Sequence, residues 1–432
     1  MDNFSQLTSR NIKNAIGFIN KYLNKNIIYG QYKKIEHLPK ENNRIETKII
    51  NEDNIIGIDS KQKITKKRKA GIDLIRIVTM IGIVYTHVLH QGKGIYKYNK
   101  YKKQLKNTDT YIFWHVNTYA LISGIIGNKS TKYSNLLYIW LCVVFYSVII
   151  HYYYLKYKHD EDVKDDLFIE YYPIIYKRYW YCTSYFGMFI FLPVVNKGIQ
   201  QLNKTEFKLL IMSIFGIFIF WQNYINVNGD AFKINGGHST IWLLCLYIIG
   251  AYIGKYNLVY TGIKRYIFSL IYLFMFFFIC MIYNKYSNYI ISDLIENYKI
   301  KIINFIKRLM SKKLNSIITT TQAILITLFF LQLKYNEYLS KLITFIGPLT
   351  FGVYLIHFNK IARKKYLSHL LNGESYNLTF NEVIKILILK SLKIFLECII
   401  IEYLRHLLFI ILKIRKICMS IENIIYKYCS LI

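Results

Sequence analysis

The sequence lacks the motifs of several familiar soluble chemistries. It contains no P-loop, no dinucleotide-binding fingerprint, no H-E-x-x-H segment and no Ser-His-Asp arrangement, so nothing supports those mechanisms. Its 7 cysteines include no C-x-x-C pair, and no histidine stands at metal-ligand spacing; we therefore expect buried free thiols and no metal site. No signal peptide is expected either, because the first apolar run of sufficient length begins only near residue 70.

Acidic residues and prolines are scarce. The chain has 25 Asp and Glu against 57 Lys and Arg, a formal net charge of +32, and only 4 prolines in 432 residues. In a soluble protein this charge would favour nucleic-acid binding. Here the basic residues stand in short loops between apolar runs, without a recognition motif, and Ile, Lys, Asn and Tyr are enriched together, as a biased base composition would produce. We expect no nucleic-acid partner, and assign the positive charge only to anionic lipid head groups.

Apolar residues, by contrast, are abundant. They make up 53% of the chain and occur in runs of about 20 residues, the length that crosses a bilayer as a helix. Because a helix satisfies its own backbone hydrogen bonds in lipid, we expect an all-α, polytopic membrane helical bundle of about ten transmembrane helices. The last predicted span carries Glu397, Glu402 and Arg405, so it either faces protein or lies partly at the interface. The candidate spans are 71–90, 110–127, 136–155, 181–196, 206–224, 240–254, 264–284, 315–333, 342–358 and 392–412.

The chain divides into three predicted parts. Residues 1–69 are a polar, basic tail or linker, residues 70–412 form the transmembrane domain, and residues 413–432 are a short C-terminal tail. The basic run 61–69 directly precedes the first span, so the positive-inside rule predicts a cytoplasmic N-terminus. An even number of spans returns the C-terminus to the cytoplasm, and we expect a multi-pass protein of the cell membrane.

The first span carries Asp73, Arg76 and His87 within it, and it ends at His90. Charge within hydrocarbon favours a functional role. On a helix, the step of eleven residues from Arg76 to His87 brings both side chains to within roughly 20° of one stripe, about 16 Å apart along the axis. Taken alone, Asp73 and Arg76 are best interpreted as an interfacial ion pair, whereas the depth of His87 favours function.

Other polar residues lie within or beside later spans. The second span holds His115, Asn117 and Ser123, which could line the same pocket as His87 or, more commonly, bond helix to helix. His357 ends the ninth span, and His238 precedes the sixth; each is a weak candidate in isolation.

Helix breakers cluster at a few places in the spans. They are Gly347, Pro348, Pro193, Gly124 and Gly127. Such residues either kink helices around a cavity or let helices pack closely, and the sequence favours neither reading.

Five segments occur in the order 73–87, 122–124, 180–197, 242–255 and 349–357. The first is Asp-x-x-Arg with a His eleven residues after the Arg, the second is Ile-Ser-Gly, and the third is an aromatic stretch led by a Trp and closed by Asn-Lys. Together they resemble the acyltransferase 3 family, multi-span membrane proteins that transfer acyl groups to extracytoplasmic sugars.

The resemblance implies a cytoplasmic acyl-CoA donor, expected to be acetyl-CoA, with no bound cofactor. The acceptor would be a hydroxyl of a glycan or lipid-linked sugar on the other side of the membrane. By the same resemblance His87 is the catalytic histidine and Arg76 its essential basic partner, beside Asp73. The imidazole of His87 would act as a general base or carry the acyl group covalently. The substrate-binding candidates are His115, Asn117, Ser123, Trp180 and His357.

The chain also departs from the family pattern. Members often carry an Arg-rich loop after the second span, whereas here residues 128–135 offer Lys129 and Lys132 only. Lysine does not replace a bidentate arginine clamp. This departure keeps open a non-catalytic member that binds acyl donors or lipids. A transporter or channel is the rival from another class, although no sequence repeat relates the two halves of the chain.

Overall fold

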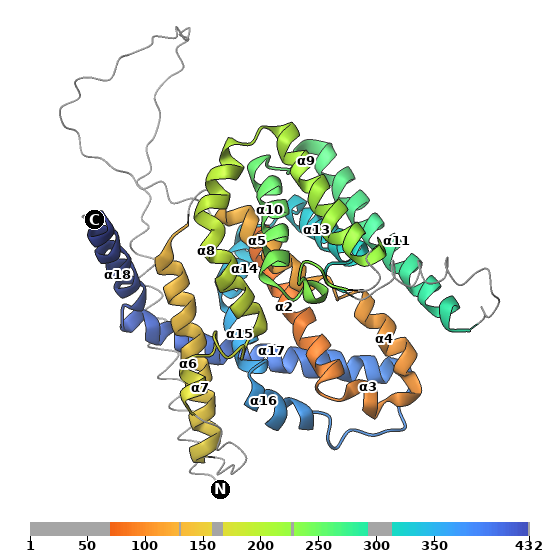
Figure 1. Cartoon of the computed structure of the whole chain (residues 1–432). Helices are drawn as coiled ribbons and strands as arrows, with labels where there is room; N and C mark the ends of the chain where they lie inside the picture. Colours follow the sequence, from red (N-terminus) through yellow and green to blue (C-terminus); the bar gives the residue numbers. More distant parts are fainter. Residues whose placement is uncertain (1–69, 129–130, 158–166, 226–228, 293–312, 431–432) are drawn as a thin grey trace, which may run out of the picture. The chain divides into compact units, whose positions relative to one another are not determined.

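A computed structural model of the chain describes residues 70–128, 131–157, 167–225, 229–292 and 313–430. The described residues form helices and contain no strand, which confirms the all-α prediction (Figure 1). The predicted N-terminal tail, residues 1–69, lies outside the described residues.

Several helices have the length and composition to cross a membrane. Within the described residues, five meet both conditions: α2 (Ala70–His90), α6 (Tyr133–Tyr157), α9 (Lys204–Ile214) with its continuation η4 (Phe215–Ile225), α11 (Gly262–Ser292), and the segment Glu337–His357. Two shorter helices of the described part are also apolar, α10 (Thr240–Lys255) and α13 (Ile317–Gln332). Further helices are α5 (His115–Gly127) and α8 (Trp180–Gln201). Membrane-like helices are thus established, and the count of ten spans stays a prediction.

Shorter elements connect these helices. They are α3 (Gly94–Lys97), η2 (Asn99–Tyr101), α4 (Lys102–Thr110), α7 (Leu167–Tyr171), η5 (Asn235–Gly237), α16 (Lys360–Lys365) and η7 (Leu367–His369).

The segment Glu337–His357 is three helices in succession, not one. They are α14 (Glu337–Ile346), the single turn η6 (Gly347–Leu349) and α15 (Thr350–His357). Pro348 stands where a new helix starts, a position at which the missing N–H costs nothing. Gly347 lies directly against Asp73 of α2, and a Cβ on Gly347 would stand 2.5 Å from the Cβ of Asp73. The break at Gly347 therefore brings α15 close to the charged end of α2.

Glycines also let α5 and α10 pack backbone to backbone. A Cβ on Gly124 would stand 2.0 Å from the carbonyl oxygen of Tyr247, and one on Gly250 would stand 2.1 Å from that of Leu121. Close approach of this kind is how small residues join helices in membranes. Of the two readings left open for Gly124, the structure supports the packing role.

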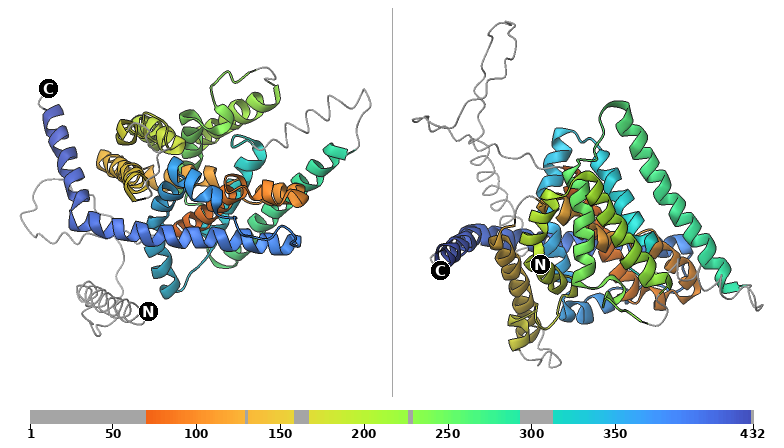
Figure 2. Two further views of the ribbon diagram at one scale, coloured as in Figure 1. Left: turned by 90° about the horizontal axis from the view of Figure 1, so that it is seen from below. Right: turned by 45° about the horizontal axis from the view of Figure 1, so that its top comes forward.

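Helix α17 (Phe380–Ile411) runs crosswise to α6 and α8 in both views (Figures 1 and 2). It starts at a capping box, in which Thr379 and Glu382 satisfy each other's backbone N–H groups. The predicted tenth span, 392–412, is part of this longer helix. Glu402 and Arg405 are buried, so the face of the helix that carries them contacts protein. This agrees with the first of the two alternatives for the last predicted span, which either faces protein or lies partly at the interface.

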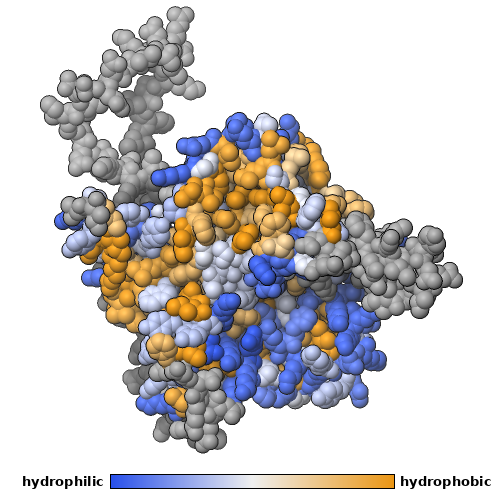
Figure 3. Space-filling view, in the orientation of Figure 1, coloured by the Kyte–Doolittle hydropathy of each residue, from blue (hydrophilic) through white to orange (hydrophobic). Residues whose placement is uncertain are grey.

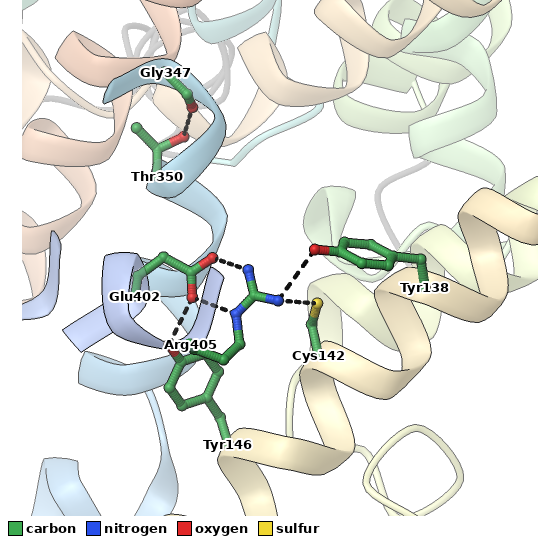
Figure 4. A network of polar contacts seen from close by, with 7 residues as sticks. All are labelled: Tyr138, Cys142, Tyr146, Gly347, Thr350, Glu402 and Arg405. Carbon is green, nitrogen blue, oxygen red and sulfur yellow. Dashed lines mark hydrogen bonds and ion pairs between the residues drawn. The ribbon is translucent and has the colours of Figure 1, made fainter. Parts of the chain in front are cut away.

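A buried ion pair joins α17 to α6 and α15 (Figure 4). Arg405 donates from Nε to Glu402 Oε2 (2.9 Å) and from Nη2 to Glu402 Oε1 (2.5 Å). On α6, Tyr146 donates to Glu402 Oε2 (2.6 Å), and Arg405 Nη1 donates to Tyr138 (3.2 Å). Gly352 of α15 lies against the same carboxylate, since a Cβ there would stand 2.1 Å from Glu402 Oε2. Three helices are thus held at one polar point inside an apolar core.

After α17 the chain turns into α18 (Ile414–Cys429), which occupies most of the predicted C-terminal tail. Cys418 of α18 is buried against α6, whereas Cys429 is exposed. The other five cysteines are buried and all seven are free thiols, so the expectation of buried thiols is wrong only for Cys429.

The surface separates into apolar and polar regions. Figure 3 shows hydrophobic residues over the upper helices and a hydrophilic region at the lower right, where α3 and α4 lie. Large exposed apolar side chains include Ile190 on α8, Trp221 on η4 and Leu270 on α11. Exposed apolar surface of this extent is unusual for a soluble monomer and suits contact with lipid.

Candidate functional site

The candidate site follows one stripe of α2. Arg76, Met80, Ile83 and His87 recur at steps of four, three and four residues, so they share one face of the helix. Met80, Ile83 and His87 line a cavity of about 60 Å³. The predicted stripe from Arg76 to His87 is therefore also the side of α2 that borders an internal space.

The cavity is mostly apolar and aromatic. Besides the three residues of α2, its lining comprises Val116, Tyr119, Trp180, Tyr181, Phe351, Tyr354 and Phe358. These residues come from α5, α8 and α15 and from the residue after α15, so four parts of the chain that are distant in sequence enclose one space. Apolar walls with few polar groups are typical of small-molecule sites.

His87 is paired with His357 of α15. Nδ1 of His87 and Nε2 of His357 are 2.8 Å apart, and Nδ1 of His357 is 2.5 Å from the carbonyl oxygen of Val353. A carbonyl oxygen only accepts, so His357 Nδ1 carries the hydrogen and its Nε2 is left to accept from His87 Nδ1. In the neutral pair, His87 therefore keeps an unprotonated Nε2, which is the nitrogen able to act on a molecule in the cavity.

Aromatic contacts fix the plane of the His87 ring. Phe358 stacks on the His87 ring, with ring centroids 4.7 Å apart. The guanidinium of Arg363, a residue of α16, lies 5.0 Å from the ring centroid of Phe358. Both the tautomer and the ring plane of His87 are therefore set before substrate binds. Efficient proton transfer requires such a positioned group.

Arg76 lies toward the other end of the stripe, in an ion pair with Asp73. Arg76 Nη1 is 2.7 Å from Asp73 Oδ1; Asp73 is buried, whereas 23% of the Arg76 side chain is exposed. Tyr119, from the cavity lining, donates to the carbonyl oxygen of Arg76 (3.1 Å). The guanidinium therefore combines an anchored position with access for an anionic ligand.

Three of the predicted substrate-binding residues bond to protein instead of lining the cavity. His115 is 3.1 Å from Thr86 Oγ1 through Nε2 and accepts the backbone N–H of Val116 at Nδ1. Asn117 donates to the carbonyl of Leu314 (2.7 Å) and accepts from Trp242 Nε1 (3.1 Å). Ser123 donates to the carbonyl of Tyr119 within its own helix (2.9 Å).

The bonds of His115 to Thr86 and of Asn117 to Trp242 match the alternative interpretation, in which polar groups in the second span hold helices together, whereas Ser123 bonds within its own helix. Of the other two candidates, Trp180 lines the cavity, and His357 forms a hydrogen bond to Nδ1 of His87. The assignment of all five to substrate binding stays a prediction, and the geometry favours Trp180.

Apart from Trp180, the sequence did not indicate the aromatic lining of the cavity. Tyr354 and Phe358 stand three residues before and one residue after His357, and Tyr119 lies four residues after His115. Helical spacing from the candidate histidines would have singled out Tyr354 and Tyr119, but aromatic residues are so frequent in this chain that spacing alone carries little weight.

The described residues hold no group of three or more His, Cys, Asp or Glu that could bind a metal ion. Of the two lysines in the loop after α5, Lys129 lies outside the described residues and Lys132 is exposed.

Comparison with known proteins supplies one match. The sequence model of the acyltransferase 3 family, described as "Acyltransferase domain", matches residues 69–362. This range contains α2 through α15 and every residue of the site described above, apart from Arg363. No curated protein and no solved structure matches the chain significantly.

Proposed function

Because this chain belongs to the acyltransferase 3 family, a membrane acyltransferase is the established starting point, and we propose that it transfers a short acyl group from acyl-CoA to a sugar hydroxyl. The acceptor would be a glycan or lipid-linked sugar on the extracytoplasmic side, which makes the protein an O-acetyltransferase of surface polysaccharide. About ten spans, with both termini cytoplasmic, would place the donor and acceptor on opposite sides of the membrane.

One observation carries this proposal: pairing with His357 leaves Nε2 of His87 unprotonated, and His87 lines an aromatic cavity beside the stripe that leads to Arg76. A cation that is partly exposed suits the phosphates of CoA, and the apolar stripe suits the arm that carries the thioester. The cavity of about 60 Å³ has room for only a few water-sized groups, which favours an acetyl group over a long acyl chain.

We propose general-base catalysis at His87. The acceptor hydroxyl oxygen forms a bond to the thioester carbonyl carbon while its proton passes to His87 Nε2. The carbon–sulfur bond then breaks, and the proton returns from His87 to the CoA sulfur as the thiol leaves. His357 stabilises the imidazolium through the hydrogen bond at Nδ1, and Val353 in turn anchors His357.

Covalent relay through His87 uses the same free nitrogen, so the geometry serves both routes that the sequence left open. An acyl-histidine trapped by rapid denaturation at neutral pH, and absent when acceptor is supplied, would identify the relay. A direct transfer leaves no acyl group on the protein.

The test is thioester turnover by protein purified and reconstituted in lipid. Free CoA released from acetyl-CoA is measured with a crude glycan or lipid extract as acceptor, for wild type and His87→Ala. We expect acceptor-dependent release that falls by at least about 10³-fold in the variant, the range of a lost acid–base group.

His151→Gln is the matched control. His151 is also a buried histidine, on α6, and it does not line the cavity. We expect this variant to keep at least a third of wild-type turnover. Turnover retained in His87→Ala would remove His87 from the chemistry, and no release by folded wild type with acyl-CoA of several lengths would contradict acyl transfer.

A further inference from the structure

A second, larger cavity also borders Trp180. Its volume is about 480 Å³, and its lining includes Lys177, Ser184, Lys233 and His238 in addition to Trp180. These residues come from the start of α8 and from the loop that leads into α10. Trp180 borders both this cavity and the one that holds His87, so a molecule in either cavity contacts the same indole.

The second cavity differs from the first in chemistry. It contains two lysines, hydroxyl groups and an amide, whereas the first is lined mainly by aromatic and aliphatic side chains. Within the described part of the chain, neither Lys177 nor Lys233 forms an ion pair with a carboxylate. Two ammonium groups that face one hollow without an acidic partner make it a site for an anion.

The backbone that carries the lysines is held in an unusual conformation. Lys177 has φ 51° and Lys233 has φ 52°, in the left-handed region that non-glycine residues seldom adopt. Asp230 holds the second turn, since its carboxylate accepts the backbone N–H groups of Ile234 (2.8 Å) and Asn235 (2.5 Å). Conformations of this kind cost free energy and are concentrated at binding sites.

His238 adds a group suited to a hydroxyl. Its ring centroid lies 4.5 Å from that of Trp180, and its Nδ1 is 3.1 Å from the carbonyl oxygen of Asn235, so Nδ1 carries the hydrogen. Burial beside Trp180 lowers the pKa of His238 below its ordinary value, which keeps the imidazole neutral near pH 7. Its Nε2 can then accept a hydrogen bond from a hydroxyl, and the flat indole can pack against a sugar ring.

We infer that this cavity holds the acceptor, and that it selects a sugar bearing a carboxylate or a phosphate, with Lys177 and Lys233 as the charge partners. The inference rests on the acyl transfer proposed above. The anionic group lies between the two lysines, the ring lies on Trp180, and a hydroxyl reaches past Trp180 toward His87. A uronic acid within a glycan and a sugar phosphate on a lipid carrier share this chemistry.

The first experiment measures KM for three small acceptors: methyl glucoside, methyl glucuronide and glucose 1-phosphate. Wild type, Lys177→Gln, Lys233→Gln and the double variant are reconstituted in lipid nanodiscs, and free CoA is recorded with acetyl-CoA as donor. Glutamine removes the charge, stays polar and is only one atom shorter than lysine. Lys103→Gln is the matched control, because Lys103 is an exposed lysine on α4 that does not line the cavity.

We expect wild type to use at least one anionic acceptor with a KM at least tenfold lower than that of methyl glucoside. Each single variant should raise the KM for that acceptor about fivefold, which corresponds to about 1 kcal/mol for an exposed charge pair. The KM for methyl glucoside and all values for Lys103→Gln should stay within twofold of wild type. The acceptor that responds, glucuronide or phosphate, identifies the source of the charge.

Equal use of neutral and anionic acceptors, or an unchanged KM in the double variant, would overturn the inference while leaving acyl transfer intact. A second readout does not depend on turnover: an amine-reactive acetylating reagent labels lysines, and mass spectrometry compares Lys177 and Lys233 with Lys103 at saturating methyl glucuronide or glucose 1-phosphate. Protection of the two cavity lysines alone supports the site even when no CoA is released, whereas equal labelling with and without both anions overturns it.

Discussion

At the residue scale, the position of one proton determines what His87 can do. The carbonyl of Val353 fixes the hydrogen of His357 on Nδ1, and His357 in turn fixes the hydrogen of His87 on Nδ1. Two neutral imidazoles in series thus leave a lone pair on Nε2 of His87, a residue that lines the cavity. The arrangement resembles a base with a supporting partner, except that the support is a neutral histidine anchored on the main chain instead of a carboxylate.

His357 is therefore predicted to be a positioning residue. In His357→Leu, His87 loses its acceptor, and we expect kcat to fall about 10-fold to 100-fold, while KM for acetyl-CoA and for acceptor stays within twofold. His357→Gln offers an amide oxygen to His87 Nδ1 and should recover part of kcat. Steady-state kinetics of both variants provide the check. Equal loss in Leu and Gln variants, or a rise in KM with unchanged kcat, would contradict the positioning role.

Arg76 is predicted to act on the donor. Its guanidinium is partly exposed, and Asp73 holds it at one end of the stripe. Arg76→Gln removes the charge and should raise the KM for acetyl-CoA at least tenfold. Arg76→Lys should recover only part of this loss of donor affinity, because an ammonium group cannot reproduce the planar guanidinium fork. The KM for acceptor, measured in the same variants, serves as the internal control. If Arg76→Lys matches wild type in donor KM and turnover, Arg76 is an anchor of the span and not a donor contact.

At the scale of elements, the packing of α15 between α2 and α17 decides whether the site exists. Gly347 allows α15 to start against Asp73, Gly352 lies against Glu402, and His357 at its end meets His87. The turn η6 thus contacts the charged end of α2, and eight residues of α15 lead from that turn to the histidine that meets His87. The Glu402–Arg405 pair fixes α15 from the other side, since Glu402 fills the space that a side chain at 352 would need.

This pair gives a prediction about stability. Arg405→Met leaves the buried carboxylate of Glu402 without its cation and should destabilise the protein by about 3–5 kcal/mol. The double variant Glu402→Leu with Arg405→Met removes both charges and should regain more than half of that loss. Thermal unfolding of purified protein in nanodiscs measures both.

Gly198→Ala is a suitable control for this comparison, because a Cβ on Gly198 of α8 meets no atom within 4 Å. It should unfold within about 2 °C of wild type, as expected for a surface change near 0.5 kcal/mol in a large chain. If the double variant is no more stable than Arg405→Met, the cluster does not act as a compensated ion pair.

At the scale of the whole molecule, the orientation of the helices sets which side receives donor and acceptor. The basic run before α2 predicts that Arg76 lies nearer the cytoplasm and that His87 and the loop after α2 lie toward the outside. The polar surface over α3 and α4 agrees with a region that leaves the bilayer after α2 (Figure 3).

One of the seven cysteines is exposed, and chemical labelling of this cysteine can measure the orientation. Cys429 stands at the end of α18, and a membrane-impermeant maleimide should label it only after cells are permeabilised. In a Cys429→Ser background, Tyr96→Cys on α3, a position that is 75% exposed, should instead be labelled in intact cells. Labelling of Cys429 in intact cells, or of Tyr96→Cys only after permeabilisation, would contradict an even number of spans with cytoplasmic ends.

Local sequence was sufficient for some features of this protein. Hydrophobic runs of spanning length predicted helices, because only helices satisfy the backbone in lipid, and the structure has helices there. The helical period alone placed Arg76 and His87 on one stripe, and the cavity borders that stripe. An ordered set of short segments was enough to identify the family, and the match over residues 69–362 confirms it.

Tertiary packing decided the rest. His87 and His357 are 270 residues apart in sequence, and nothing local to either predicts that they meet. His115, Asn117 and Ser123 are polar and could have lined a binding site, yet each forms a hydrogen bond to another part of the protein. His115 bonds to α2, Asn117 to α10, and Ser123 to the backbone of its own helix. The physical reason is that helical periodicity determines which face a side chain lies on, whereas the partner of that face depends on how all the helices pack together.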